Sequence, residues 1–364
     1  MKLIAESGLW STGRLVAPTP LVAVLEVSGA VLSWAIDEES GAAAITFTDL
    51  ARADWLWRVL GESGHRAVAA AVDGRPPEDA QTIDVNGVGV LPGSVDQLRR
   101  LALGHWMRRW WPASHRDGIA ALDGAVLDAE IALLTSAAQD YFADDTFDSD
   151  VTGLLAAHSA ALTELVRAGD PRVVELVRSA SELTDDAGIV LAEPAASAPR
   201  RDDYALAAGA QRGQTSSGVI ASGTGSVSWA AVPPALFDAA EDTVDWRIEA
   251  SASTANVLVA VQLLGPGSPE GVAVRLRSGD LGGAGVLDGH GRASFPLVDA
   301  GQQPVPESAA WNQDWQAAVV TVGAADVDES AETRDRVRDF ARRRLAAPAP
   351  DAFLAEILAA ESDY

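Results

Sequence analysis

The chain has 364 residues, of which 48% are hydrophobic and 22% are charged, and it contains no cysteine. This length and composition can bury a large core, and we expect two or three domains. The lack of cysteine excludes disulfides, thiolate zinc sites and cysteine nucleophiles. Because 52 acidic residues outnumber 27 basic ones, the formal net charge is −25. That charge repels phosphate backbones and anionic lipids, so we expect neither a nucleic-acid nor a membrane partner.

The N-terminal part of the chain contains no predicted targeting or membrane segment. Residues 1–15 lack an uninterrupted apolar core, and the apolar stretch from Leu21 to Ile36 is interrupted by Glu26 and Gly29. The first pattern does not fit a secretory signal, and the second stretch is too short to span a bilayer. We therefore expect a cytoplasmic protein.

Residues 1–93 predict a β-rich α+β domain. Short runs rich in Val, Ile and aromatic residues, separated by turn residues, indicate strands at 13–18, 21–27, 30–36 and 43–48. One helix is expected from about Asp49 to Val59, and residues 65–74 are interpreted as a further strand. Asn86-Gly87 lies between two β-prone runs, which predicts a tight hairpin. Gly87 and Gly89 also have dinucleotide-loop spacing, but Pro92 stands where that motif needs a small residue.

Residues 94–190 predict a helical domain. Ser94 and Gln97 have capping-box spacing, and Pro112 should end the first helix near Trp111. Further helices are expected at about 124–142, 151–169 and from Pro171 onward. The second of these is apolar on nearly all sides, so it should be buried.

Two carboxylates interrupt that buried helix. Asp128 and Glu130 need partners there, because a buried charge is costly unless it is paired. The arginines of the preceding helix, Arg108 and Arg109, are the nearest candidates in the sequence. We predict at least one Arg–carboxylate pair between the two helices.

The second half of the chain predicts a linker, a β domain and a helical tail. Residues 191–203 resemble a linker, and short strands at regular spacing in 204–323 predict an antiparallel β-sandwich. Residues 274–297 are similar to the strand–turn–strand pattern of immunoglobulin-like and transthyretin-like accessory modules, with Asp288, Gly291 and Phe295 in a D-x-x-G-x-x-x-F turn. The resemblance implies the fold and no activity. Residues 324–364 predict two short helices separated by "APAP".

Two stretches are candidate binding surfaces. Residues 104–118 concentrate basic and aromatic side chains of the kinds enriched at interface centres: Trp106, Arg108, Arg109, Trp110, Trp111, His115 and Arg116. The alternative is that the tryptophans pack in the core while the arginines neutralise nearby acids. The last helix has an apolar face that would fit a partner groove, formed by Phe353, Leu354, Ile357 and Leu358.

Three further patterns are candidate metal, catalytic or ligand-binding sites. Asp148, Asp150 and Thr152 match the first ligand positions of a calcium loop, but Ser159 stands where a bidentate Glu is required, so helix capping is favoured. An acid–base or metal site is conceivable around His105, His115, Asp117 and Glu130. A stacking platform for a peptide or carbohydrate could come from Trp229, Trp246, Trp311 and Trp315.

Three function classes follow from these patterns. The first is a non-catalytic adaptor or accessory subunit that binds a protein or peptide partner within a larger assembly. The second is an enzyme of unfamiliar type, and the third is a peptide- or carbohydrate-binding β-sandwich protein. Because no catalytic motif stands out, we expect the first, without a cofactor or metal. The oligomeric state and the partner are not specified by the sequence.

Overall fold

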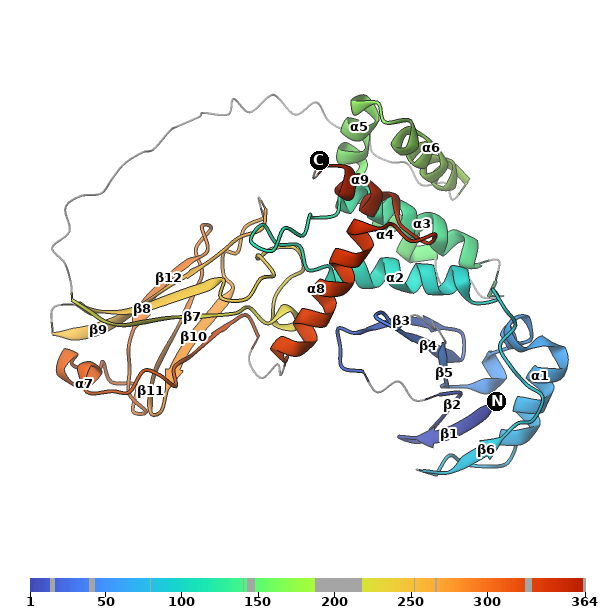
Figure 1. The fold of residues 1–364 in the computed structure, drawn as a ribbon, viewed down its shortest axis with the longest axis horizontal. Coiled ribbons are helices and arrows are strands. Elements are labelled where there is room, and N and C mark those ends of the chain that lie inside the picture. Colours follow the sequence, from blue (N-terminus) through green and yellow to red (C-terminus); the bar gives the residue numbers. More distant parts are fainter. Residues whose placement is uncertain are drawn as a thin grey trace. The chain divides into compact units, whose positions relative to one another are not determined.

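The structure is a computed structural model, and it describes residues 1–13, 17–38, 43–78, 80–139, 141–142, 148–186, 218–251, 253–265, 267–324 and 329–362. Within these ranges the fold is α+β, with an N-terminal six-stranded antiparallel sheet, C-terminal antiparallel sheets and nine α-helices. The chain divides into two compact units (Figure 1). Unit 1 comprises Met1–Trp111, Leu122–Ala195 and Asp335–Tyr364; unit 2 comprises Pro112–Ala121 and Ala196–Arg334. None of the helices in the described ranges is long and apolar enough to cross a membrane.

The sheet of unit 1 has the strand order β3-β4-β5-β2-β1-β6, and every neighbouring pair is antiparallel. Its strands are β1 (Lys2–Glu6), β2 (Leu9–Ser11), β3 (Val22–Val27), β4 (Ala30–Ala35), β5 (Ala44–Phe47) and β6 (Thr82–Asp84). In β3 the residues Ala23, Leu25 and Val27 are buried while Val24 and Glu26 face solvent, as the alternation of one buried face requires. The strands expected at 21–27, 30–36 and 43–48 are confirmed. Residues 14–16 of the expected strand 13–18 lie outside the described residues.

Two expectations for residues 49–93 are wrong. The region holds a short 3-10 helix (Leu50–Arg52) and α1 (Leu56–Val72), and α1 continues through the strand expected at 65–74. Four alanines between positions 67 and 71 favour helix, and Val68 gives it a buried contact. The Asn86-Gly87 turn forms with a positive φ at Gly87, but β6 pairs with β1 and no strand follows the turn, so there is no hairpin.

The helical part of unit 1 contains α2 (Asp96–Trp110), α3 (Gly124–Gln139), α4 (Asp148–Ala156), α5 (Ser159–Ala168) and α6 (Pro171–Asp186). Pro112 ends the first helix, as predicted. The capping box is wrong, because the Ser94 hydroxyl donates to the Leu91 carbonyl oxygen instead of capping α2. The single helix expected at 151–169 is two helices. The calcium-loop candidates Asp148, Asp150 and Thr152 lie within α4, so their backbone is helical and does not form such a loop.

The tail folds into unit 1. It contains α8 (Ala331–Ala346), whose first turn belongs to unit 2, and α9 (Leu354–Ser362). Phe353, which precedes α9, is fully buried. Its ring packs against the backbone of Gly104, and a Cβ added to Gly104 would lie 3.0 Å from the ring. Leu354, Ile357 and Leu358 are half-buried. The prediction that Phe353 docks into a partner is therefore wrong, because it packs inside its own unit.

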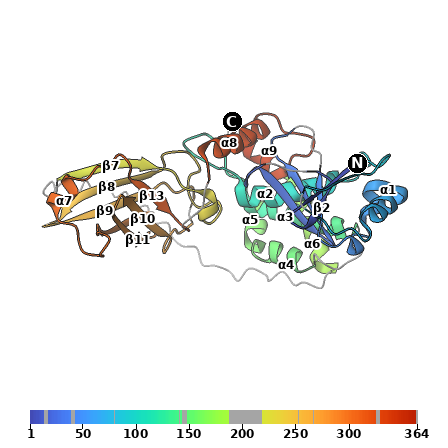
Figure 2. The same cartoon turned by 90° about the horizontal axis from the view of Figure 1, so that it is seen from below.

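Unit 2 contains two antiparallel sheets. The four-stranded sheet has the order β12-β9-β8-β7, and the three-stranded sheet has the order β11-β10-β13. The elements are β7 (Val219–Gly225), η2 (Trp229–Ala231), β8 (Val244–Ser251), β9 (Thr254–Val261), β10 (Ala273–Ser278), β11 (Leu281–Val286), β12 (Arg292–Pro296), α7 (Glu307–Trp311) and β13 (Val319–Val322). In Figure 2, β7, β8 and β9 lie above β10 and β11. One buried cluster draws side chains from both sheets, among them Ile248 and Val259 of the first and Leu276 and Val322 of the second.

Candidate functional site

The basic–aromatic segment 104–118 is divided between the two units. Its helical part lies in unit 1, where the Trp106 indole N–H donates to the Pro20 carbonyl oxygen at 2.6 Å and the ring meets Phe340 edge-on. Trp106 is only 3% exposed. The Arg109 guanidinium stacks 4.2 Å from the centre of the Trp110 ring, and both residues, like Trp111, are half-buried. The helical part is therefore occupied by packing contacts within unit 1.

The second part of the segment belongs to unit 2 and is organised by Asp238, which is 3% exposed. Its carboxylate accepts hydrogen bonds from the Ser114 hydroxyl at 2.6 Å and from the backbone N–H of His115 at 2.8 Å. Burial alone would raise the pKa of Asp238, but these bonds and those from the N–H groups of Ala240 and Arg116 outweigh it and hold the pKa below its ordinary value. The ionised Asp238 carboxylate thus holds residues 114–116 in place.

The remaining side chains of this part also bond within unit 2. The His115 ring nitrogen Nε2 lies 2.8 Å from the Leu264 carbonyl oxygen. The Arg116 guanidinium donates to the carbonyl oxygens of Glu241 and Asp242 at 3.0 and 2.9 Å. Both side chains are exposed to solvent, yet their polar groups bond to backbone carbonyl oxygens of unit 2.

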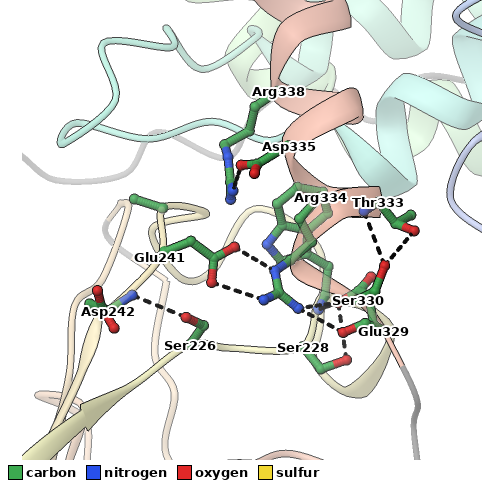
Figure 3. A network of polar contacts seen from close by, with 12 residues as sticks. Ser226, Ser228, Glu241, Asp242, Glu329, Ser330, Thr333, Arg334, Asp335 and Arg338 are labelled. Atoms are coloured by element: carbon green, nitrogen blue, oxygen red, sulfur yellow. Dashed lines mark hydrogen bonds and ion pairs between the residues drawn. The ribbon is translucent and has the colours of Figure 1, made fainter.

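A second polar network in unit 2 holds the start of α8 (Figure 3). Arg334 forms a two-pronged ion pair with Glu241, with both nitrogen–oxygen distances at 2.8 Å. Glu329 accepts hydrogen bonds from the Ser228 hydroxyl at 3.1 Å and from the Trp229 N–H at 2.8 Å. The Arg334 side chain is 10% exposed, so the pair is largely shielded from solvent. A bidentate pair of this kind positions a segment; it leaves no reactive group available.

The predicted Arg–carboxylate pairing between the first two helices is confirmed. Arg108 Nε lies 3.0 Å from Asp128 Oδ1, and His158 Nε2 lies 2.9 Å from Asp128 Oδ2. Glu130 pairs with Arg100 at 3.2 Å, a residue that the sequence reasoning had not singled out. Burial raises the pKa of Glu130, although the N–H groups of Leu354 and Ala355 and the charge of Arg100 oppose the rise.

Further ion pairs fix the tail on α2. Arg344 holds Glu356 through two contacts of 2.5 and 2.7 Å and Asp351 at 2.9 Å. Asp351 also pairs with Arg99 at 2.7 Å. Burial opposes ionisation of Asp351, but Arg344 and Arg99 outweigh it and lower its pKa. Together with Arg100 and Glu130 these residues form what we call the buried ion network, in which each cation has a carboxylate.

The residues proposed for an acid–base or metal site do not gather in one unit. His105 and Glu130 belong to unit 1, whereas His115 and Asp117 belong to unit 2. Glu130 is occupied by Arg100 and by the Ala355 N–H at 3.3 Å. Among the residues described in the structure, no three His, Asp or Glu side chains form a group that could hold a metal ion.

The tryptophan platform that the third function class would use does not form among these four residues. Trp229 and Trp246 are 8% and 5% exposed, and Trp315 is half-buried with its indole N–H donating to the Ala310 carbonyl oxygen. Only Trp311 among the four is exposed, at 53%. The Trp246 ring packs closely over its β7 neighbour Gly223, where a Cβ would come within 2.5 Å of the ring. The pattern of alternation places these rings inward, where large aromatic surfaces are buried.

The outer face of the four-stranded sheet in unit 2 carries a hollow of about 700 Å³, which we call the sheet hollow. Two rows of side chains cross all four strands there: Thr224, Asp245, Ala260 and Arg292 in the first, and Ser222, Arg247, Leu258 and Ser294 in the second. The residues between them, such as Trp246, Val259 and Ala293, point into the core. Asp288, from the turn before β12, completes the lining.

The sheet hollow is nearly balanced in charge. Arg247 pairs with Glu249 at 2.7 Å, while Asp245 and Asp288 carry negative charge beside Arg292. The backbone N–H groups of Arg292 and His290 lower the pKa of Asp288, so this carboxylate is ionised at neutral pH. Leu258 and Ala260 form an apolar middle between the charged ends. The lining thus offers donors, acceptors and a small apolar floor.

Sequence reasoning did not find the sheet hollow. Its members are spread over positions 222 to 294, and they meet only through the pairing of strands. The alternating pattern of β8 and β12 was a usable signal, because it separates Asp245, Arg247, Arg292 and Ser294 from the core residues between them. Comparisons of the chain with protein-family models, curated proteins and solved structures found no match.

Proposed function

We propose that the chain is a non-catalytic adaptor or accessory subunit that binds an extended segment of a protein partner in the sheet hollow. In this proposal unit 2 is a β-sandwich of the immunoglobulin-like or transthyretin-like type. The observation that carries the proposal is the hollow itself, which is wide enough to involve all four strands. Pockets with an apolar floor and a few placed polar groups are the usual sites for a ligand.

The chemistry of the lining favours a peptide. An extended peptide presents backbone donors and acceptors at regular spacing, which matches hydroxyls such as Ser222 and Ser294 and charged groups such as Asp245 and Arg292. A small side chain of the peptide fits over Leu258 and Ala260. A carbohydrate is less favoured, because sugar rings stack on aromatic faces and the only tryptophan of the lining, Trp246, is 5% exposed.

The lining also favours binding over acid–base catalysis. Its described ionisable side chains are carboxylates and guanidiniums, and Asp288 has a lowered pKa. General acid–base catalysis works best with a group whose pKa lies near the working pH. A set of permanently charged groups orients a ligand without transferring its protons.

The test is site-specific photo-crosslinking in the cells that produce the protein. A photoreactive amino acid at Ala260, in the centre of the hollow, should yield a discrete protein adduct that mass spectrometry can identify. The same amino acid at Glu270, an exposed residue of a loop outside the hollow, is the matched control. Filling the hollow with Arg247→Trp should abolish the adduct formed at Ala260. No adduct at Ala260, or the same adduct at both positions, would contradict the proposal.

A further inference from the structure

The outer face of the other sheet in unit 2 has a different composition. In its central strand β10, Val274, Leu276 and Ser278 are buried, so Arg275 and Arg277 project outward between them. Arg275 stands between Ala284 of β11 and Thr321 of β13, and Arg277 stands between Gly282 and Val319. We call this surface the arginine face; it also includes Val286, which pairs with Ala273.

The neighbours of the two arginines are small or apolar. Gly282 and Ala284 have almost no side chain with which to cover the arginine stems. Val286 and Val319 are 60% and 61% exposed, the two highest values among the exposed large hydrophobic residues of the described chain. The solvated face of an antiparallel sheet usually carries polar side chains. Exposed valines beside two arginines therefore indicate a surface suited to contact.

Among the residues that the structure describes, no ion pair compensates the charge of this face. Arg247 on the opposite sheet pairs with Glu249, and Arg334 pairs with Glu241. Neither Arg275 nor Arg277 has a carboxylate at ion-pair distance among the described residues, and the one bond from Arg277 goes to the Gly279 carbonyl oxygen at 3.4 Å. In a chain with a net charge of −25, this face is a local positive site. Screening confines charge effects to about 10 Å at ordinary ionic strength, so distant acids do not cancel it, and Asp280 in the turn after β10 forms no ion pair with either arginine.

We propose that the arginine face binds an acidic, extended segment of a protein partner. Arg275 and Arg277 are two residues apart on one strand, which separates their Cα atoms by roughly 7 Å. An extended segment with acids at alternating positions repeats at the same distance, so two carboxylates can meet the two guanidiniums. Apolar residues of that segment then cover Val286 and Val319. This surface is separate from the sheet hollow, and the inference does not depend on the proposed function.

The probe is a short fluorescent peptide of alternating Glu and Val, titrated with the full chain and followed by fluorescence anisotropy at low ionic strength. We expect saturable binding that weakens as salt is added. The double variant Arg275→Glu/Arg277→Glu should lose affinity by at least about tenfold, since two exposed charge pairs are removed and reversed. A peptide of alternating Lys and Val should not bind.

The matched control is Arg66→Glu/Arg167→Glu, which makes the same change of charge at two exposed helix positions of unit 1, outside both the arginine face and the sheet hollow. It should keep the affinity of the original chain, and thermal unfolding of both double variants should show that they are folded. Equal loss in both variants, retained affinity in Arg275→Glu/Arg277→Glu, or no binding of the acidic peptide would overturn the proposal. Binding to vesicles of anionic phospholipid that needs Arg275 and Arg277, without binding of the peptide, would overturn it in favour of a lipid surface.

Discussion

In unit 1, Arg344 is 7% exposed and holds the fully buried Glu356 with two contacts. In unit 2, Arg275 and Arg277 stand on an exposed sheet face, with no carboxylate at ion-pair distance in the described part of the chain. The same side chain serves two purposes because its surroundings differ. In the helical core an unpaired charge would cost several kcal/mol, so every arginine of the buried ion network has a carboxylate. On the sheet surface, water solvates the guanidinium, and its charge remains available to another molecule.

The largest expected effect comes from breaking the buried pair. Glu356→Ala removes both contacts to Arg344 and the acceptor of the Phe353 N–H, leaving a buried cation with Asp351 alone. We expect a loss of about 3–5 kcal/mol in the free energy of unfolding, measured by urea denaturation.

The control for this change is Asp339→Ala on α8, the helix that carries Arg344, which breaks an exposed pair with Arg342. That pair is worth at most about 1 kcal/mol. If the two variants lost the same stability, burial would not be what distinguishes the network.

A smaller, pH-dependent effect is expected at Glu130. Its pKa is raised in the folded chain mainly by burial, so its contribution to stability is full below the pKa of the unfolded chain. That contribution is lost as the pH rises through the raised folded value. The free energy of unfolding of the original chain minus that of Glu130→Gln should therefore fall as the pH rises above about 4, the ordinary pKa of a glutamate.

Denaturation of both proteins across this pH range measures the difference. Glu164→Gln, at a carboxylate that is largely exposed, provides the matched control, because the burial that acts on Glu130 is absent there. A difference that grows with pH would mean that the Arg100 pair outweighs the cost of burial at Glu130.

The smallest effect on stability is expected on the arginine face. Arg275→Gln/Arg277→Gln removes two charges without a carboxylate partner, and the free energy of unfolding should change by no more than about 0.5 kcal/mol. The same variant should bind the acidic peptide more weakly. A large loss of stability would show that these arginines support the fold, and the contrast between the two units would then fail.

Local sequence signals predicted much of the fold. Pro112 ended α2, Pro171 began α6, and the apolar runs at 21–27 and 30–36 became neighbouring strands. The error at 65–74 has a physical cause, because a short run of alanine and valine suits either a strand or a helix. The burial of Val68 on the helical stretch that follows the kink at Gly61 favours the helix.

The sites depended much more on tertiary structure. The sequence determined that Asp128 and Glu130, placed on an apolar helix, had to find cations. It offered Arg108 and Arg109 as candidates, and of these Arg108 pairs with Asp128. It could not select Arg100 for Glu130 or Arg344 for Glu356, since helix packing sets which side chains meet. The sheet hollow and the arginine face are likewise products of strand register. The alternation of polar and apolar residues along a strand shows which side chains point away from the core. Only the pairing of strands distant in sequence decides which of those side chains lie next to one another.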